Sequence, residues 1–275
     1  MTDLTQTRAA YAAGITARAG AEYPEILPAL LRAFATVPRE AYCGPGPWTV
    51  FGADGSEPVT DPAGLYRDVL VSLRPETGLN NGEPSLHALG LAAARVRPGE
   101  RVVQVGAGGG YYTAILAELV GPAGRVDAYE IEPGLAAAAR AALAGYPGVT
   151  VHGRSGAQAP LPPADLVTVA AGATAPLPLW LDALIPGGRL LVPLTGERGG
   201  GMLLATRPDE GAAAWPARIL APVSFVPCTG ARRPDEAARL TDAFRGRGWR
   251  GVRRLHRDGR PGAGAFVAGE GWWLA

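Results

Sequence analysis

The amino-acid sequence predicts an α/β protein, in which a Rossmann-like, doubly wound and mostly parallel sheet carries an N-terminal helical arm and a C-terminal α+β extension. From Arg101 onward, short apolar strands alternate with amphipathic helices, which is the order that parallel β-α units require. The first of these strands runs directly into a glycine-rich turn and a helix. After Met202 this alternation stops, and the short apolar runs that follow are typical of antiparallel strands.

The segment before Arg101 is predicted to contain helices and ordered loops. An apolar helical pattern covers 29–37 and ends at Pro38, which has no backbone donor. The stretch 44–64 is rich in Gly, Pro, Ser and Asp, so we expect a loop or arm on the surface. A second helix is expected over 86–96, between Pro84 and the stop signal Pro98-Gly99.

The elements after Arg101 follow from hydrophobic periodicity. We expect parallel strands over 102–105, 125–131, 149–152, 166–170 and 189–194, helices over 112–120, 135–143 and 177–184, antiparallel edge strands over 202–206 and 219–226, a helix over 234–245, and a hairpin about Asp258-Gly259 within 250–275. The chain is therefore divided into an N-terminal helical and loop cap (1–95), a Rossmann-like binding domain (96–230) and a C-terminal extension (231–275).

Composition excludes several classes of protein. With 275 residues, 47% hydrophobic and 19% charged, the chain is neither disordered nor a coiled coil. Its 26 basic and 25 acidic residues nearly cancel, so nucleic acid and membranes are not expected partners. The two cysteines do not support a metal site or a disulfide framework. Because the start, Met1-Thr2-Asp3, lacks the plan of a signal peptide, we expect a cytoplasmic protein.

The glycine-rich turn, 105–111, is the most informative motif. Its glycines allow a tight bend and bring a ligand close to the start of the next helix, where free N–H groups favour a polar or anionic group. A dinucleotide fingerprint would need a third glycine where Tyr111 stands, so NAD is disfavoured. A P-loop is excluded because no Gly-Lys-Ser/Thr follows.

A carboxylate at the end of the second strand further restricts the class of ligand that the turn can bind. Glu130 stands where it can accept hydrogen bonds from both hydroxyls of a ribose. A GxGxG turn followed by such a residue is typical of S-adenosylmethionine methyltransferases, and this cofactor is the one we predict. The alternative is a tight turn in an ordinary α/β protein that binds nothing.

At this point the sequence resembles the protein-L-isoaspartate O-methyltransferase family of class I methyltransferases, as a divergent member. The resemblance spans roughly 30–226 and is carried by 35–39 (ATVPR), 103–114 (VQVGAGGGYYTA), Glu130, 165–169 (DLVTV) and 186–193 (PGGRLLVP). It implies a class I methyltransferase fold and cofactor contacts from Gln104, Gly106, Ala107, Gly108, Gly110, Tyr111, Glu130, Ile131, Ser155 and Gly156.

The sequence also departs from the family pattern. Gln104 replaces an acidic residue that would meet the ammonium group of the cofactor, and Ser155 replaces an aspartate near the adenine amino group. The family's Thr-Ile-Ser-Gln-Pro segment aligns with Asn80-Asn81-Gly82-Glu83-Pro84. The chain also continues for about 45 residues beyond the usual family end. These differences indicate a specialised peptide substrate, as in relatives that esterify ribosomally made peptides and, in some cases, drive aspartimide formation.

The methyl transfer that the resemblance implies needs little general acid–base catalysis. A carboxylate acceptor, with an ordinary pKa of about 4, is ionised at neutral pH and needs no general base. Positioning is therefore the expected catalytic device. We expect Asn80, Asn81 and Ser85 to hold the acceptor, with His87 as a further donor or base. A plain turn at 80–81 and a packed or surface histidine are the structural alternatives.

Other readings stay open. The tail ends in Trp272-Trp273, of which one indole would pack and the other face a peptide, although edge-strand packing accounts for both. Arg232-Arg233 and Arg253-Arg254 can attract an acidic peptide or be solvated charges. The alternatives to a carboxyl methyltransferase are an enzyme acting on a small metabolite or nucleobase, and a noncatalytic binding module. No metal site is expected.

Overall fold

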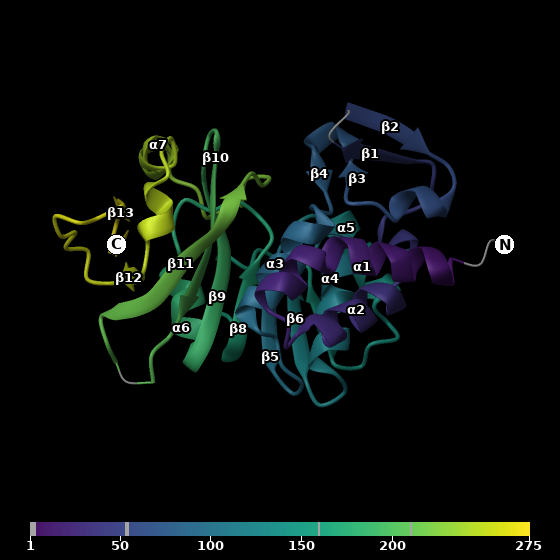
Figure 1. Cartoon of the computed structure of the whole chain (residues 1–275), viewed down its shortest axis with the longest axis horizontal. Coiled ribbons are helices and arrows are strands. Elements are labelled where there is room, and N and C mark those ends of the chain that lie inside the picture. The colour runs from purple at the N-terminus through teal and green to yellow at the C-terminus, as the bar shows by residue number, and fades with distance from the viewer. Residues whose placement is uncertain (1–3, 53–54, 159, 210) are drawn as a thin grey trace. The chain divides into compact units, whose positions relative to one another are not determined.

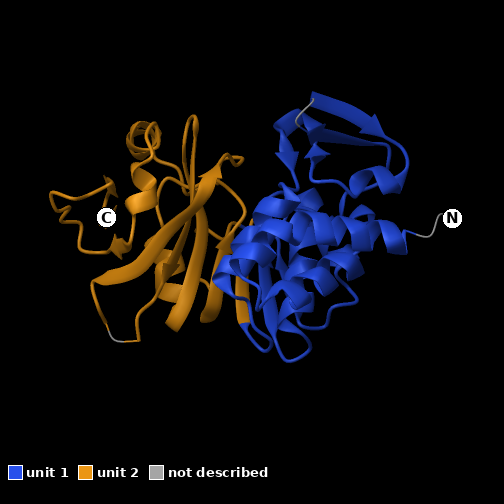
Figure 2. Ribbon diagram, viewed as in Figure 1, with its two compact units in different colours: residues 1–100, 107–154 blue, residues 101–106, 155–275 orange. Residues whose placement is uncertain are grey.

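The structure, a computed structural model, describes residues 4–52, 55–158, 160–209 and 211–275. The residues Met1-Thr2-Asp3, on which the signal-peptide expectation depends, lie outside this range. The chain forms two compact units, the first made of 1–100 and 107–154 and the second of 101–106 and 155–275 (Figure 2). These units cut across the expected division into cap, binding domain and extension, which describes roles along the chain and stays a prediction.

Unit 1 contains a helical layer and a small antiparallel sheet (Figure 1). The helices α1 and α2 pack on each other and on α3, and apolar side chains of all three are buried. The elements are α1 (Thr5–Glu22), α2 (Leu27–Thr36), η1 (Arg39–Tyr42), β1 (Trp48–Gly52), β2 (Gly55–Val59), η2 (Pro62–Leu65), β3 (Leu70–Arg74), η3 (Pro75–Thr77), β4 (Leu79–Asn80), α3 (Pro84–Ala94), α4 (Tyr111–Val120), β6 (Arg125–Tyr129), α5 (Pro133–Ala142) and β7 (Val149–His152).

The expectation of a surface loop over 44–64 is wrong. Residues 48–52 and 55–59 of this segment form β1 and β2, which join β3 and β4 in a sheet of order β2-β1-β3-β4. Val50 is 1% exposed and lies in a small core with Cys43, Val59, Leu65 and Val71. Gly, Pro and Ser obscured these strands because only one face of the sheet is apolar and each strand is short.

Unit 2 contains parallel strands that continue into antiparallel ones, in the order β13-β14-β12-β11-β10-β9-β8-β5. The strands β5, β8 and β9 are parallel, and Val105 lies opposite Val169 in this register. The elements are β5 (Arg101–Val105), β8 (Ala164–Val169), α6 (Pro178–Ala183), β9 (Leu184–Gly196), β10 (Gly199–Thr206), β11 (Ala214–Val223), α7 (Pro234–Ala243), η4 (Gly248–Gly251), β12 (Arg254–His256), β13 (Val267–Gly269) and β14 (Trp272–Leu274).

Two expectations for the C-terminal part are corrected. The strands β10 and β11 are antiparallel as expected, but they are not edge strands, because β12, β14 and β13 continue the sheet beyond them. The hairpin does not turn at Asp258-Gly259. It joins β13 to β14 at Glu270-Gly271, while Asp258 accepts hydrogen bonds from the Trp273 indole (2.8 Å) and the Arg260 amide. Both tail tryptophans are buried, so packing accounts for them.

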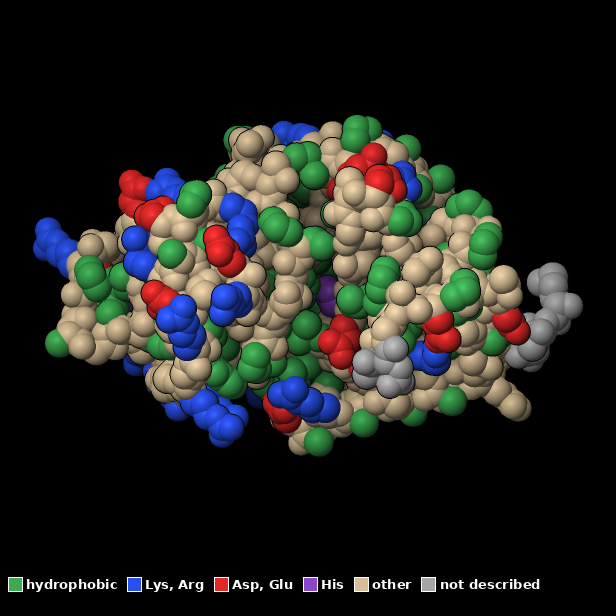
Figure 3. Space-filling view, turned by 90° about the horizontal axis from the view of Figure 1, so that it is seen from above, with side chains coloured by type: hydrophobic (Ala, Val, Ile, Leu, Met, Phe, Trp, Pro, Cys, Tyr) green, Lys and Arg blue, Asp and Glu red, His purple; other side chains and the backbone are tan. Residues whose placement is uncertain are grey.

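The surface agrees with a nearly neutral chain. The face in Figure 3 carries basic and acidic side chains interspersed, and the formal net charge is +1. Within the described residues, no helix is both long enough and apolar enough to cross a membrane.

Candidate active site

The glycine turn has the backbone conformation that its sequence predicts. Gly106, Gly108 and Gly110 all have positive φ angles, between 56° and 96°, which only glycine adopts without strain. Gly109 is required for a different reason, because a Cβ atom there would collide with the carbonyl oxygen of Tyr42 in η1. Gly110 is the N-cap of α4, and no side chain of the described structure caps this helix start. The start of α4 therefore suits a polar or anionic group of a ligand.

The Glu130 side chain is hydrogen-bonded to this turn within unit 1. It follows β6, is 6% exposed, and accepts hydrogen bonds from the Gly108 amide (2.7 Å) and the Glu132 amide (2.9 Å) on separate oxygens. The Ala107 amide donates to the Tyr129 carbonyl, which ties the turn to the same strand end. Burial raises the pKa of Glu130 above its ordinary value, and the amide hydrogen bonds oppose this shift. Each oxygen keeps a lone pair that can accept a ribose hydroxyl.

The next residue supplies an apolar surface. Ile131 is 49% exposed, an unusual position for a large aliphatic side chain beside a buried carboxylate. A flat aromatic group such as adenine would cover it. The turn, Glu130 and Ile131 thus form a donor set and a surface that suit a nucleoside, and their cofactor roles stay predictions.

Three further candidates for cofactor contact lie in unit 2. Gln104 is 2% exposed on β5, opposite Thr168 of β8. The Ser155 hydroxyl accepts a hydrogen bond from the Ala157 amide (3.1 Å), and the Gly156 carbonyl accepts one from the buried Trp180 indole (2.9 Å). Ser155 and Gly156 therefore belong to an ordered turn, and their contact with a cofactor stays a prediction.

Tyr111 is placed differently from the expectation. Its ring is 1% exposed and packs against Phe34 and Tyr42, and its hydroxyl lies 3.2 Å from that of Tyr11. The side chain of Tyr111 thus anchors α4 to the N-terminal helices. Only its backbone, at the first position of α4, faces the turn.

The four candidate acceptor-binding residues lie together at β4 and the start of α3. Asn80 makes the plain turn that was the structural alternative, because its side chain accepts from the Gly82 amide (3.0 Å) and donates to the Gly78 carbonyl (3.2 Å). The Ser85 amide donates to Asp68 (2.8 Å), and this serine is half-buried. Their contact with a substrate stays a prediction.

Asn81 has mainly structural partners. Its side-chain oxygen accepts from the Val71 amide (3.0 Å) and from the Arg39 guanidinium (3.2 Å), and its amide nitrogen donates to the sulfur of Cys43 (3.5 Å). At 9% exposure, this side chain positions the segment around it. We therefore favour a positioning role for Asn81 over direct contact with the acceptor.

His87 is held by an aromatic partner. Its imidazole stacks on Tyr112 with ring centroids 3.7 Å apart, and the Tyr112 hydroxyl donates to the Gly82 carbonyl (3.1 Å). Burial, reinforced by the positive charge of Arg39, lowers the pKa of His87 to about 3. The imidazole is therefore neutral at physiological pH.

Arg39 is a functional position that sequence reasoning had treated only as part of a family motif. The side chain is fully buried, and its guanidinium donates to the carbonyls of Leu65 (2.6 Å), Arg67 (2.9 Å) and Val69 (2.6 Å) as well as to Asn81. Arg39 thus fixes the loop before β3 and, through Asn81, the segment that leads to His87. An arginine directly after an apolar helix and a proline was the available signal.

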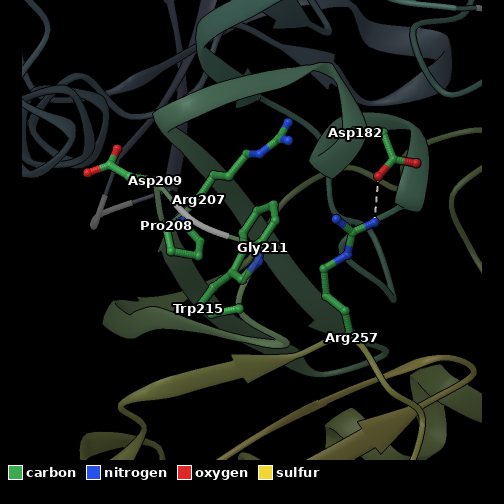
Figure 4. A pocket seen from close by; sticks show the side chains of 8 residues that line it. Asp182, Arg207, Pro208, Asp209, Gly211, Trp215 and Arg257 are labelled. Atoms are coloured by element: carbon green, nitrogen blue, oxygen red, sulfur yellow. Dashed lines mark hydrogen bonds and ion pairs between the residues drawn. The ribbon is translucent and has the colours of Figure 1, made fainter.

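The cavity shown in Figure 4 is separate from these residues. It measures 540 Å³ and lies in unit 2 where β10 ends and β11 begins, at the edge of the sheet opposite to the carboxyl ends of β5 and β8. Its charges are largely satisfied, since Arg257 pairs with Asp182 (2.5 Å) over the Trp215 ring and Arg207 donates to the Leu184 carbonyl. The lining consists of Asp182, Arg207, Pro208, Asp209, Gly211, Ala212, Trp215 and Arg257.

The fold and the turn together define a Rossmann-like methyltransferase of class I. Comparison with known proteins then gives the family. The family model for protein-L-isoaspartate(D-aspartate) O-methyltransferase matches residues 64–233. The chain therefore belongs to this family.

Relatives support the assignment over most of the chain. Protein-L-isoaspartate O-methyltransferase 1 of Anaeromyxobacter sp. (strain Fw109-5) is 37% identical over 214 residues, which cover 74% of this chain and 89% of the relative. The enzyme of the same name from Methylorubrum populi is 36% identical over 203 residues, covering 72% and 85%.

Solved structures agree on the fold. A protein-L-isoaspartate O-methyltransferase superposes with a TM-score of 0.64 at 21% identity, over 79% of this chain and 65% of that one. A Plasmodium falciparum chain assigned to the same enzyme class, in complex with S-adenosyl-L-homocysteine, gives 0.63 at 18% identity, over 81% and 98%.

Proposed function

We propose that this protein transfers a methyl group from S-adenosylmethionine to a carboxyl group of a peptide or protein. The observation that carries the proposal is the buried Glu130 carboxylate bonded to the Gly108 amide under the glycine turn, in a chain of the isoaspartyl methyltransferase family. Relatives named for this activity cover most of the chain. The S-adenosyl-L-homocysteine bound by the Plasmodium chain is the product form of the same cofactor.

The residues present suit this cofactor. The backbone of 106–110, Glu130 and Ile131 would hold its polar and aromatic parts, and Gln104 would supply a neutral acceptor where the family has a charge. When bound, S-adenosylmethionine supplies a methyl group on a positively charged sulfur. Loss of the acidic group at 104 weakens the attraction for the ammonium group but keeps one hydrogen-bond acceptor.

The protein's own contribution is to position the acceptor. An ionised carboxylate needs no general base, and the neutral imidazole of His87 places no positive charge beside it. Asn80, Ser85 and His87 are the proposed contacts to the acceptor, and they lie within eight residues of one another. Holding the oxygen in line and excluding water would supply the acceleration.

The substrate is proposed to be a peptide or protein carboxylate, at an aspartyl or isoaspartyl side chain or at a C-terminus. The family name favours isoaspartate, whereas Asn80-Asn81-Gly82-Glu83-Pro84 in place of the family segment favours a more specialised peptide. An aspartyl ester that closes on the next amide nitrogen, with loss of methanol, would give aspartimide. A cytoplasmic location stays a prediction.

Mass spectrometry of peptides incubated with the protein and S-adenosylmethionine tests the proposal. A gain of one methylene mass that mild base removes indicates an ester, and a net loss of water from the starting peptide indicates aspartimide. Cofactor binding by calorimetry without any transfer to isoaspartyl, aspartyl or C-terminal carboxylates would contradict the proposal and favour a noncatalytic module. Transfer to a metabolite or nucleobase alone would also contradict it.

A further inference from the structure

Arg232 is held in place by backbone hydrogen bonds on both sides of it in unit 2. The segment that carries it runs beside the loop after β8, where the Gly172 amide donates to the Val226 carbonyl (2.7 Å) and the Thr174 amide donates to the Ala231 carbonyl (2.9 Å). On the other side of Arg232, the Arg233 amide donates to the Thr174 hydroxyl (3.0 Å). Both neighbours of Arg232 are thus tied to the same residue of the loop.

A buried carboxylate reinforces this arrangement. Glu236 of α7 is 2% exposed, accepts a hydrogen bond from the Thr174 hydroxyl (3.0 Å), and with its other oxygen accepts from the Glu270 amide (3.1 Å) and the Trp272 indole (3.3 Å). The C-terminal extension is therefore anchored at the loop that positions Arg232. A buried carboxylate with satisfied oxygens makes such an anchor rigid.

The guanidinium of Arg232 has only neutral partners. One terminal nitrogen donates to the Thr195 carbonyl (2.8 Å), the Thr195 hydroxyl (3.0 Å) and the Gly172 carbonyl (3.4 Å), and the other donates to the Gly196 carbonyl (3.4 Å). Across the described residues no acidic group pairs with it, whereas the adjacent Arg233 pairs with Glu270. Arg232 is a half-buried, fixed positive charge that has no counter-ion within 4–52, 55–158, 160–209 and 211–275.

This charge lies on the edge of unit 2 where the glycine turn begins. Gly172 follows the carboxyl end of β8, Thr195 lies at the carboxyl end of β9, and β5, which precedes Gly106, is the next strand beside β8. The Ala170 amide donates to the Val105 carbonyl (2.8 Å) at this edge. Strands are about 4.8 Å apart and rise about 3.3 Å per residue, and Thr195 lies two residues beyond the point of β9 that is level with Gly106, so Thr195 and Gly106 are about 12 Å apart.

We propose that Arg232 binds a non-reacting carboxylate of an acidic peptide substrate, an inference that rests on the proposed carboxyl methylation. The reacting carboxylate loses its charge on methylation, so a guanidinium paired with it would stabilise the ground state more than the transition state. A guanidinium on a second carboxylate instead contributes equally to both states. It therefore selects substrates by affinity.

The second carboxylate can come from a neighbouring acidic side chain or from the peptide's C-terminus. Three isoaspartyl peptides separate these sources: one with a neighbouring Asp and an amidated end, one with a neighbouring Asn and a free end, and one with Asn and an amidated end. KM and kcat of methyl transfer and the anisotropy of the same peptides carrying a fluorophore would be measured with wild type, Arg232→Met, Arg232→Lys and Arg233→Met. Arg233→Met is the matched control, since it removes the same charge one residue away.

Arg232→Met should raise KM and the dissociation constant by about tenfold to a hundredfold, the effect of one charge-assisted hydrogen bond, for at least one of the two doubly charged peptides. We expect kcat to stay within about twofold and Arg232→Lys to recover part of the lost affinity. KM and the dissociation constant should not change in this way for the peptide with Asn and an amidated end, nor for any peptide with the Arg233→Met variant. The peptide that responds identifies the source of the carboxylate.

The inference would be overturned if each of the three peptides had the same KM and the same dissociation constant with Arg232→Met as with wild type. A loss of kcat shared by all three peptides would also overturn it, because it indicates a structural role as a cap on Thr195 and Gly196. If no peptide is methylated by wild type but Arg232→Met still weakens binding of an acidic peptide, the anion site stands and the proposed function fails.

Discussion

Replacement of Glu130 by glutamine tests the site at its centre. The carboxylate accepts the Gly108 amide at 2.7 Å and the Glu132 amide at 2.9 Å, one on each oxygen. Glutamine has only one acceptor oxygen, so its NH₂ group must face one of these two N–H donors. The turn is then strained, and the charge that a ribose hydroxyl would meet is lost.

The expected loss follows from these contacts. Hydrogen bonds to a charged group contribute about 1.5 to 3 kcal/mol, so the affinity for S-adenosylmethionine should fall by about ten- to a hundredfold in Glu130→Gln. Isothermal titration calorimetry measures this affinity directly. Glu130→Ala should lose about as much, because it removes the same acceptor.

Glu132→Gln is the matched control. Glu132 also accepts two backbone amides, those of Gly134 (3.1 Å) and Leu135 (2.5 Å), but there it caps α5. Its replacement should lower the free energy of unfolding by about 1 kcal/mol and leave cofactor affinity unchanged. Unaltered affinity in Glu130→Gln, or an equal loss in both variants, would refute the ribose assignment.

Two further predictions concern the residues that position the acceptor segment. Arg39→Met removes the guanidinium that donates to the Leu65 and Val69 carbonyls, which is also one of two donors to the Arg67 carbonyl and the Asn81 oxygen. It should lower the free energy of unfolding by about 2 to 6 kcal/mol in urea titrations, while Arg18→Met on the exposed face of α1 changes it by less than about 0.5 kcal/mol. A loss below about 1 kcal/mol for Arg39→Met would contradict this. The imidazole resonances of His87 should not titrate until pH nears 3, whereas an unfolded histidine titrates near 6.5. Between about pH 6.5 and 3 the His87 imidazole is protonated in the unfolded chain but not in the folded protein. The stability that His87 contributes is therefore complete above about pH 6.5 and falls as pH drops toward 3. A titration midpoint near 6.5 for His87 in the folded protein would contradict this prediction.

The parallel strands and their helices were predictable because their signals are local. Val102 to Val105 forms a short apolar strand, the glycines after it impose the turn, and the helix that follows is apolar along almost its whole length. The same holds for Glu130, since the end of a strand fixes where its next side chain emerges. Strand and helix bounds were off by a few residues, where caps rather than periodicity decide the end.

For the residues proposed to bind the methyl acceptor, the sequence predicted where they lie but not which side chains point inward. Asn80, Asn81, Ser85 and His87 do lie together, because they are neighbours in sequence. The inward orientation of the Asn81 side chain depends on its hydrogen bond with Arg39, which lies 42 positions earlier in the chain. The spacing of residues along the sequence does not predict that contact.

The sequence by itself determined the α/β class, the glycine turn and the carboxylate beneath it, because periodicity, backbone freedom and strand ends act over a few residues. Only the tertiary structure decided that 48–52 and 55–59 pair as strands, that Tyr111 anchors a helix and that Arg232, at the carboxyl edge, has no acidic partner among the described residues. Those outcomes depend on partners tens of residues away, and long-range pairing is selected by the burial and hydrogen bonding of the whole fold rather than by any local preference.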